Sequence, residues 1–229
     1  MPQNRPRVLL VGIRKDLNFL PNKLAFAKGF LPEPNNEFVD LKDLLSDLID
    51  LDYENGGETF SYPSKANNKV QKWFRVNRFT GFCSKKGAPL MDHKYSNHSI
   101  AVSKKFKLMQ KNGGIIPEDM KTKKFSQKLL PSVWGARGPT ITATSMPDDF
   151  VHFSQPRTLT VREWARLQTF PDWYQFSGSR TTGGVRRAGN PRKGIFEREV
   201  PKYTQIGNAV PVRLALSLGN HFKEILHAN

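Results

Sequence analysis

The sequence predicts an α/β fold, and segments near its two ends carry that prediction. Val8 to Val11 is a short continuous apolar run closed by Gly12, as in a strand buried on both faces of a parallel sheet. Residues 210–226 place apolar side chains on one face at helical spacing, with Pro211 near the start of the predicted helix. Few other runs in the chain could supply neighbouring strands for such a sheet.

The composition narrows the class of protein. A chain of 229 residues can form one or two domains, and this one has no secretory signal and no apolar run near the ~20 residues of a membrane-spanning helix. Its single cysteine excludes an internal disulfide framework and a cysteine-rich zinc site, which fits a reducing cytoplasm. The five histidines lack metal-ligand spacing, so no metal site is expected.

Charge is distributed unevenly along the chain. The sequence has 36 Lys and Arg against 20 Asp and Glu, a formal net charge of +16. Residues 17–64 hold 3 basic and 9 acidic side chains, a net of −6, whereas residues 65–128 hold 16 basic and 3 acidic, a net of +13. A basic block of that density indicates a polyanionic partner, most often nucleic acid. A merely solvated lysine-rich face is the alternative.

The acidic and basic regions differ in predicted structure. Residues 38–52 predict an amphipathic helix, and residues 53–69, rich in Asn, Gly and Ser, predict a loop. The apolar face of the helix would carry Leu41, Leu44, Leu45 and Leu48. The aromatic residues interleaved in the basic block are Trp73, Phe74, Phe79, Phe82, Tyr95, Phe106 and Phe125. Such rings can stack on bases, but in a chain with 11% aromatics they more often belong to a core.

Residues 159–176, LTVREWARLQTFPDWYQF, predict a short helix with defined ends. Thr160, followed three residues later by Glu163, has the form of a capping box. The Phe-Pro step would end the helix after about three turns, because proline disfavours helical geometry in the residue before it. Helix formation alone does not explain Arg162, Arg166 or the Pro-Asp step.

Two further stretches could bind phosphate. Gln3, Arg5 and Arg7 alternate just before the first strand, so in an extended segment all three project to one side. Two guanidiniums and an amide on one face suit a phosphate or a base edge, and a solvated strand end fits the spacing equally well. Residues 177–199 form a glycine-rich loop with six basic residues, which can approach a phosphate chain closely or serve as a disordered linker.

Two shorter segments complete the local predictions. PTITAT, at residues 139–144, predicts a short strand. Residues 205–208 predict a polar turn at the N-terminus of the last helix, where backbone N–H groups can hold a carboxylate or phosphate.

Three of these segments resemble sequence motifs of the DNA (cytosine-5) methyltransferases. PQNRPR at residues 2–7, with the strand and Gly12 after it, is similar to motif VIII. RTLTVREWARLQTFPD at 157–172 resembles motif IX, and QIGNAVP at 205–211 resembles motif X. The three stand in the family's order, separated by a basic variable block where the family keeps its target-recognition domain.

The resemblance implies that other motifs of the family lie outside these residues. In the family the Phe-x-Gly-x-Gly cofactor loop, the Pro-Cys nucleophile and the Glu-Asn-Val motif precede motif VIII, which begins here at residue 3. Cys83 follows phenylalanine in GFCSKK, so we expect a buried or incidental thiol despite two lysines that could lower its pKa. We therefore expect a separately encoded subunit or a truncated product, active only with a partner chain that carries the missing motifs.

The resemblance also implies roles for individual residues. Family members flip a cytosine out of double-stranded DNA and methylate its carbon 5 with S-adenosylmethionine. This chain would supply Arg7 to the flipped base, with Gln3 and Arg5 around it. Asn208 and Ala209 would border the methionine end of S-adenosylmethionine, in a site shared with the partner chain.

DNA contacts and structural support are expected elsewhere. The glycine-rich loop would contact DNA through Arg180, Arg186, Arg187 and Arg192. Motif IX would brace the target-recognition domain, without a part in catalysis, through Arg162, Glu163 and Arg166. The block from about residue 20 to 155 would read sequence from the major groove.

The resemblance refines the expected α/β fold into two parts. One is the C-terminal portion of a Rossmann-like S-adenosylmethionine-dependent methyltransferase domain, and the other is a smaller, largely irregular α+β target-recognition domain. The boundaries would be residues 1–19 for the motif VIII strand, 20–199 for recognition and 200–229 for the motif X turn and last helix. The expected role is DNA recognition in a restriction-modification system; the alternatives are an inert DNA-binding remnant of a truncated gene and an unrelated basic RNA-binding protein.

Overall fold

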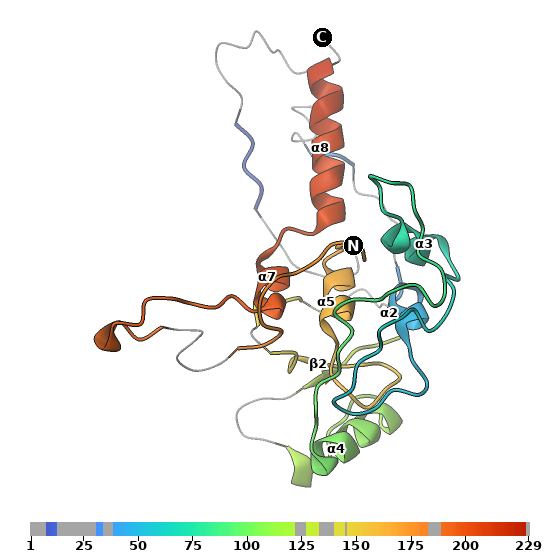
Figure 1. The fold of residues 1–229 in the computed structure, drawn as a ribbon, viewed down its shortest axis with the longest axis vertical. Helices are drawn as coiled ribbons and strands as arrows, with labels where there is room; N and C mark the ends of the chain where they lie inside the picture. Colours follow the sequence, from blue (N-terminus) through green and yellow to red (C-terminus); the bar gives the residue numbers. More distant parts are fainter. Residues whose placement is uncertain are drawn as a thin grey trace.

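The computed structural model describes residues 8–12, 31–33, 39–121, 127–132, 140–144, 146–182 and 189–227. Short helices and irregular segments gather around a central helix, α5 (Figure 1). No helix in these ranges combines the length and apolar character needed to cross a bilayer.

Four short helices and a 3-10 turn enclose the main hydrophobic core. They are α2 (Leu41–Leu45), the turn η1 (Ser46–Leu48) that continues it, α3 (Lys69–Arg75), α5 (Val161–Leu167) and α7 (Lys202–Asn208). The predicted leucine face is confirmed, because all four of its leucines are buried in this core. The helix is shorter than predicted, since the backbone at Ile49 is already extended.

A second, smaller cluster lies beside α4 (Ile100–Lys111), whose N-terminus is capped by the side chain of Ser99. It contains Phe106, Met109, Ile116 and Val151. The strands β1 (Lys128–Leu129) and β2 (Phe150–Val151) pair in parallel next to it, and the 3-10 turn η2 (Glu118–Met120) precedes them. These two strands form the one sheet found among the described residues.

Two predicted strands do not form in the described structure. Residues 8–12 belong to no strand, and Val8 and Leu10 are 88% and 95% exposed. Residues 140–144 are also irregular, although Ile141 is buried. A strand forms when neighbours satisfy its backbone groups, and the described residues offer no adjacent strand to residues 8–12. Residues 8–12 therefore do not form the predicted doubly buried strand in the described structure.

The region that resembles motif X is helical and does not form the predicted turn. Residues 205–208 lie inside α7, which places Tyr203 and Ile206 in the main core. Burial of these two side chains stabilises a helix that its short sequence does not predict. The predicted last helix is confirmed as α8 (Val212–His227).

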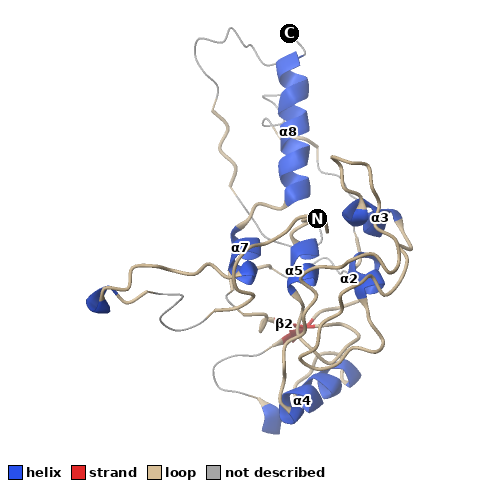
Figure 2. Ribbon diagram, viewed as in Figure 1, coloured by secondary structure: helices blue, strands red, loops and turns tan. Residues whose placement is uncertain are grey.

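α8 projects from the body of the molecule (Figures 1 and 2). Its predicted apolar face is only partly covered: no side chain from residue 212 to 226 is fully buried, Leu218 and Phe222 are partly buried, and Leu226 is 60% exposed. Val212, at its start, is the residue of α8 that packs against the main core. Each large apolar side chain left in water forgoes about 1.5–3 kcal/mol of burial free energy. α8 therefore keeps part of its apolar surface in contact with water.

We expect one substitution to have different effects in α2 and in α8. Leu44→Ala should lower the free energy of unfolding by about 2–5 kcal/mol, because it leaves a cavity in the core. Leu226→Ala should change it by less than about 0.5 kcal/mol, because Leu226 is 60% exposed near the end of α8. Urea unfolding followed by tryptophan fluorescence measures both. Equal losses would show that α8 is packed in the isolated chain.

Candidate functional site

α5 lies at the centre of the candidate site, and all seven of its residues are buried. The predicted capping box is confirmed: Thr160 Oγ1 accepts from the N–H of Glu163 at 3.2 Å, and Glu163 Oε2 accepts from the N–H of Thr160 at 2.8 Å. The helix is about two turns long and ends at Leu167, before the Phe-Pro step that was predicted to end it. Thr169 ends it instead, with a left-handed φ of 59°.

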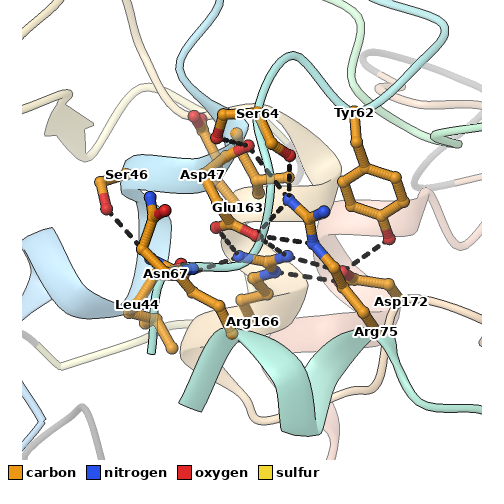
Figure 3. A network of polar contacts seen from close by, with 12 residues as sticks. Leu44, Ser46, Asp47, Tyr62, Ser64, Asn67, Arg75, Glu163, Arg166 and Asp172 are labelled. Atoms are coloured by element: carbon orange, nitrogen blue, oxygen red, sulfur yellow. Dashed lines mark hydrogen bonds and ion pairs between the residues drawn. The ribbon is translucent and has the colours of Figure 1, made fainter. Parts of the chain in front are cut away.

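A buried ionic cluster joins α5 to α2, η1 and α3 (Figure 3). Arg166 donates from Nη1 to Asp47 Oδ1 at 2.5 Å and from Nη2 to Asp172 Oδ2 at 2.6 Å. Asp47 Oδ2 also accepts from Arg75 Nη2 at 2.7 Å. The four side chains balance two positive against two negative charges, so the cluster brings no net charge into the core.

Burial and the charged neighbours act in opposite directions in this cluster. Burial alone would raise the pKa of Asp172, but Arg166 and the hydroxyl of Tyr62 hold that pKa below its usual range. Burial, and then the adjacent Asp172 carboxylate, raise the pKa of Tyr62, so its protonated hydroxyl donates to Asp172 Oδ2 at 2.8 Å. Asp172 is therefore ionised and fully hydrogen-bonded, which suits a structural bridge.

A second buried ion pair lies at the N-terminal end of α5. Arg157 donates from its two terminal nitrogens to the two oxygens of Glu163, at 2.8 and 2.7 Å. Burial would raise the pKa of Glu163, but the charge of Arg157 lowers it. His93 and His152 pack beside this pair, and burial lowers their pKa values to about 4 and about 3. Both imidazoles are therefore neutral at pH 7.

Arg162 connects α5 to segments on either side of it. Its Nε donates to Met91 O at 3.1 Å, and its Nη2 donates to Tyr174 O at 3.0 Å. The carboxylate of Asp92 lies 3.7 Å from the same Nη2 and also accepts from Lys202 Nζ at 2.6 Å. Lys202 begins α7, so this arginine helps to place the region that resembles motif X.

The end of α5 holds the turn between α7 and α8. Gln168 Nε2 donates to the carbonyl oxygens of Ile206 and Ala209 at 2.9 and 3.3 Å. The first two N–H groups of α8 donate to Gln168 O at 3.1 Å and to Thr169 Oγ1 at 2.9 Å. These N–H groups therefore have protein acceptors and are not open to a carboxylate or phosphate, contrary to the prediction. Asn208 remains exposed beside the turn.

Gly207 allows residues 140–144 to pass directly over α7. A Cβ atom at this position would lie 2.1 Å from Thr142 O, which is closer than any side chain permits. Thr204 Oγ1 donates to Thr144 O at 2.8 Å in the same place. The stretch predicted as a strand is therefore held by contacts with a helix.

The structure describes part of the predicted DNA-binding set. Arg180 is half-buried and donates to Ser96 Oγ at 3.2 Å. Arg192 belongs to an arm, residues 189–199, that includes the 3-10 turn η3 (Pro191–Lys193) and projects from the body (Figure 1). Gln3, Arg5, Arg7, Arg186 and Arg187 lie outside the described residues, and their roles stay predictions.

The aromatic residues of the basic block divide between core and surface. The core interpretation is confirmed for Phe74, Tyr95 and Phe106, which are buried. Phe79 and Phe82 are 84% and 62% exposed. Phe125 is outside the described residues, and Trp73 is half-buried against Phe74.

Cys83 lies opposite Val76 in an isolated antiparallel bridge and is half-buried. No histidine or other general base is hydrogen-bonded to its thiol in the described structure. It therefore has the incidental placement expected from the sequence.

Similarity to known proteins identifies the family of this chain. A family model for C-5 cytosine-specific DNA methylases matches residues 1–224. The chain belongs to this family. It is 28% identical to Type II methyltransferase M.DdeI of Desulfomicrobium norvegicum, over 95% of this chain and 50% of that protein. It is 27% identical to DNA (cytosine-5)-methyltransferase CMT2 of Arabidopsis thaliana, over 89% of this chain and 18% of that protein.

A solved structure shares the fold of this family member. It is a DNA modification methyltransferase encoded within an Escherichia coli prophage, which superimposes with a TM-score of 0.54 at 19% identity. The match covers 94% of this chain and 53% of the other. The chain spans about half the length of the curated relatives it matches first.

The segment that resembles the family's motif IX is therefore a buried support. Sequence reasoning named Arg162, Glu163 and Arg166 but missed the residues that pair with them or hold the next turn. Asp47 and Arg75 were missed altogether, whereas Arg157, Gln168 and Asp172 were recognised as part of the motif but given no contact. One signal was available: an apolar helix that carries two arginines needs carboxylates to match them, and the predicted leucine-rich helix is acidic.

Replacing Arg166 by Met should lower the free energy of unfolding by about 3–5 kcal/mol, because Asp47 and Asp172 would lose the cation they share. Thermal or urea unfolding measures the loss. Arg198→Met, at an exposed position of the arm, should change stability by less than about 0.5 kcal/mol. A loss below about 1 kcal/mol for Arg166→Met would show that the cluster contributes little to stability.

Acidification should destabilise the chain as the pH falls from about 6.5 to 4. In this window the unfolded state binds protons on His93 and His152 that the folded state does not, so unfolding is favoured at lower pH. For His93 alone, the linked loss reaches about 3 kcal/mol by pH 4. Urea midpoints measured across this range test it. The His93→Gln variant, although less stable at pH 7, should lose less unfolding free energy on acidification. A urea midpoint of the unaltered chain that does not change with pH would contradict the prediction.

Proposed function

We propose that these residues form the DNA-recognition half of a DNA (cytosine-5) methyltransferase from a restriction-modification system. Methyl transfer would then require a complementary polypeptide with the Pro-Cys nucleophile and the Glu-Asn-Val motif. The observation that carries the proposal is α8, whose apolar face is only partly covered: none of its described side chains is fully buried, and Leu226 is 60% exposed. Residues 8–12 support it, because they are apolar and exposed, as a strand without its sheet would be.

The complementary polypeptide would provide the reactive thiolate. Cys83 is the one cysteine among the 229 residues, and it sits in a hairpin bridge without a hydrogen-bonded base. The target cytosine has to leave the base stack before its ring can be attacked. On this proposal Arg7 contacts the flipped base, and Gln3 and Arg5 contact its surroundings and the adjacent phosphate.

The turn between α7 and α8 fits the methionine end of S-adenosylmethionine, which supplies the methyl group when bound. Gln168 fixes the turn through the carbonyl oxygens of Ile206 and Ala209. The side-chain amide of Asn208 is exposed next to it and can donate to a carboxylate. Asn208 and Ala209 would therefore border the cofactor, in a site completed by the complementary polypeptide.

DNA binding would rest on the basic block of residues 65–128 and on the arm. Exposed lysines of α4, including Lys104 and Lys107, belong to that block. Neutralising phosphates releases counterions, so affinity should fall steeply as salt rises. The ionic cluster and the Arg157–Glu163 pair are buried, so they hold this surface in shape without contacting DNA.

Reconstitution tests the proposal. The 229-residue chain is mixed with a polypeptide bearing the family's upstream motifs, and tritiated methyl transfer to duplex DNA is measured for each part and for the mixture. We expect transfer in the mixture alone. Leu218→Asp on the apolar face of α8 should abolish it by preventing association, whereas Ser217→Asp, on the exposed side of the same turn, should leave it within about two-fold of the unaltered mixture.

Two outcomes would contradict the proposal. Methyl transfer by the purified chain alone would show that it contains its own nucleophile. Salt-sensitive DNA binding with no methyl transfer in the mixture would favour the alternative, a catalytically inert DNA-binding remnant.

A further inference from the structure

The tip of the arm, residues 190–195, is a closed and defined structure. Asn190 and Ile195 exchange both backbone hydrogen bonds, Asn190 N to Ile195 O at 2.7 Å and Ile195 N to Asn190 O at 3.0 Å. Between them η3 begins at Pro191, and Gly194 ends it in the left-handed region, with a φ of 71°. The tip is thus a short 3-10 turn closed by one antiparallel bridge, and its own backbone hydrogen bonds hold its shape.

Gly189 is required for this shape. Its φ is 69°, and a Cβ atom there would lie 2.9 Å from Ile195 O, the oxygen that closes the tip. An alanine at this position would clash with Ile195 O and would also have a strained backbone conformation. Gly113, at the end of α4, has a φ of 62°, and a Cβ atom there would have no neighbouring atom within 4 Å. Gly113→Ala would therefore introduce backbone strain without a steric clash, which makes it a control for Gly189→Ala.

The base of the arm is fixed to the body. Ser179 Oγ donates to Glu199 Oε2 at 3.0 Å, and Lys202 N donates to Ser179 O at 3.0 Å. Three residues separate Ile195 from Glu199, a span of four Cα–Cα steps, so Ile195 at the end of the tip lies at most about 14 Å from this base. The rise of duplex DNA is about 3.4 Å per base pair, so that reach corresponds to about four base pairs.

The side chains of the tip are exposed and basic. Arg192 and Lys193 are solvent-exposed, and neither forms an ion pair within the part of the chain that the structure describes. Phe196, just after the tip, is 73% exposed. A fixed ribbon that carries two unpaired cations and an apolar ring away from the core has the surface of a binding element.

We propose that the tip is a preformed DNA clamp that enters the major groove about four base pairs from the position of Arg180. This inference rests on the proposed function, since it requires that the chain bind duplex DNA. The major groove is about 12 Å wide and admits a two-stranded ribbon. Arg192 and Lys193 contact phosphates at the edges of the groove, and Phe196 packs into it. The clamp adds contacts beside the recognised sequence and lengthens the bound DNA segment.

The test compares salt dependence of DNA binding for the full 229-residue chain and its variants on one duplex of about 30 base pairs. Removing both tip charges, by Arg192→Ala with Lys193→Ala, should reduce the slope of log affinity against log salt by about 1.8, since each lost phosphate contact changes it by about 0.9. Gly189→Ala keeps every charge but opens the tip. It should therefore reduce the slope by at least half of the reduction seen for the double variant. Gly113→Ala should leave the slope unchanged.

Two results would overturn the clamp. A slope change below about 0.5 for the double variant would show that the tip does not contact phosphate. An unchanged slope for Gly189→Ala would show that the arm acts as a charged tether without a required shape. A wild-type slope near zero would instead refute DNA binding itself, and the proposed function with it.

Discussion

The Arg166 guanidinium, shared between Asp47 and Asp172, is the interaction on which the rest of the described fold depends. Helices α2, α3, α5 and α7 have five to seven residues each, which is too short for independent stability. Their stability must therefore come from contacts between them. The cluster joins three of these helical segments in a buried region, where loss of one ion would leave its partners charged and unsolvated. Such a cluster favours one arrangement of the helices over others.

The same helix also fixes the surfaces that face outward. α5 orders its own start through Arg157 and Glu163, and its end through Gln168 and Thr169, which hold the beginning of α8. Arg162 adds a connection to the beginning of α7. A buried helix with seven buried residues therefore positions an exposed turn, the arm and α8 at once. These contacts explain why residues 157–172 carry so specific a sequence.

The features that sequence predicted well are those that local chemistry determines. The capping box needs two side chains three residues apart, and the leucine face and α8 follow from helical spacing. The features that it missed depend on distant residues. Asp47 and Arg166 are 119 positions apart in the chain, and no local pattern shows that they meet. α7 forms because Tyr203 and Ile206 reach a core built by other segments, and a strand at residues 8–12 would need a neighbouring strand from a distant segment.

The two kinds of uncovered surface differ in physical character, and this separates two binding events. α8 presents apolar side chains, so its association should depend on buried area and persist at salt concentrations that screen charge. The arm and the basic block present cations, so their association with DNA should weaken steeply with salt. The ionic cluster lies between these surfaces and is buried, where salt has little effect on it. Under the proposed function, assembly with a complementary polypeptide and binding to DNA would therefore vary independently, because they would use different surfaces and different forces.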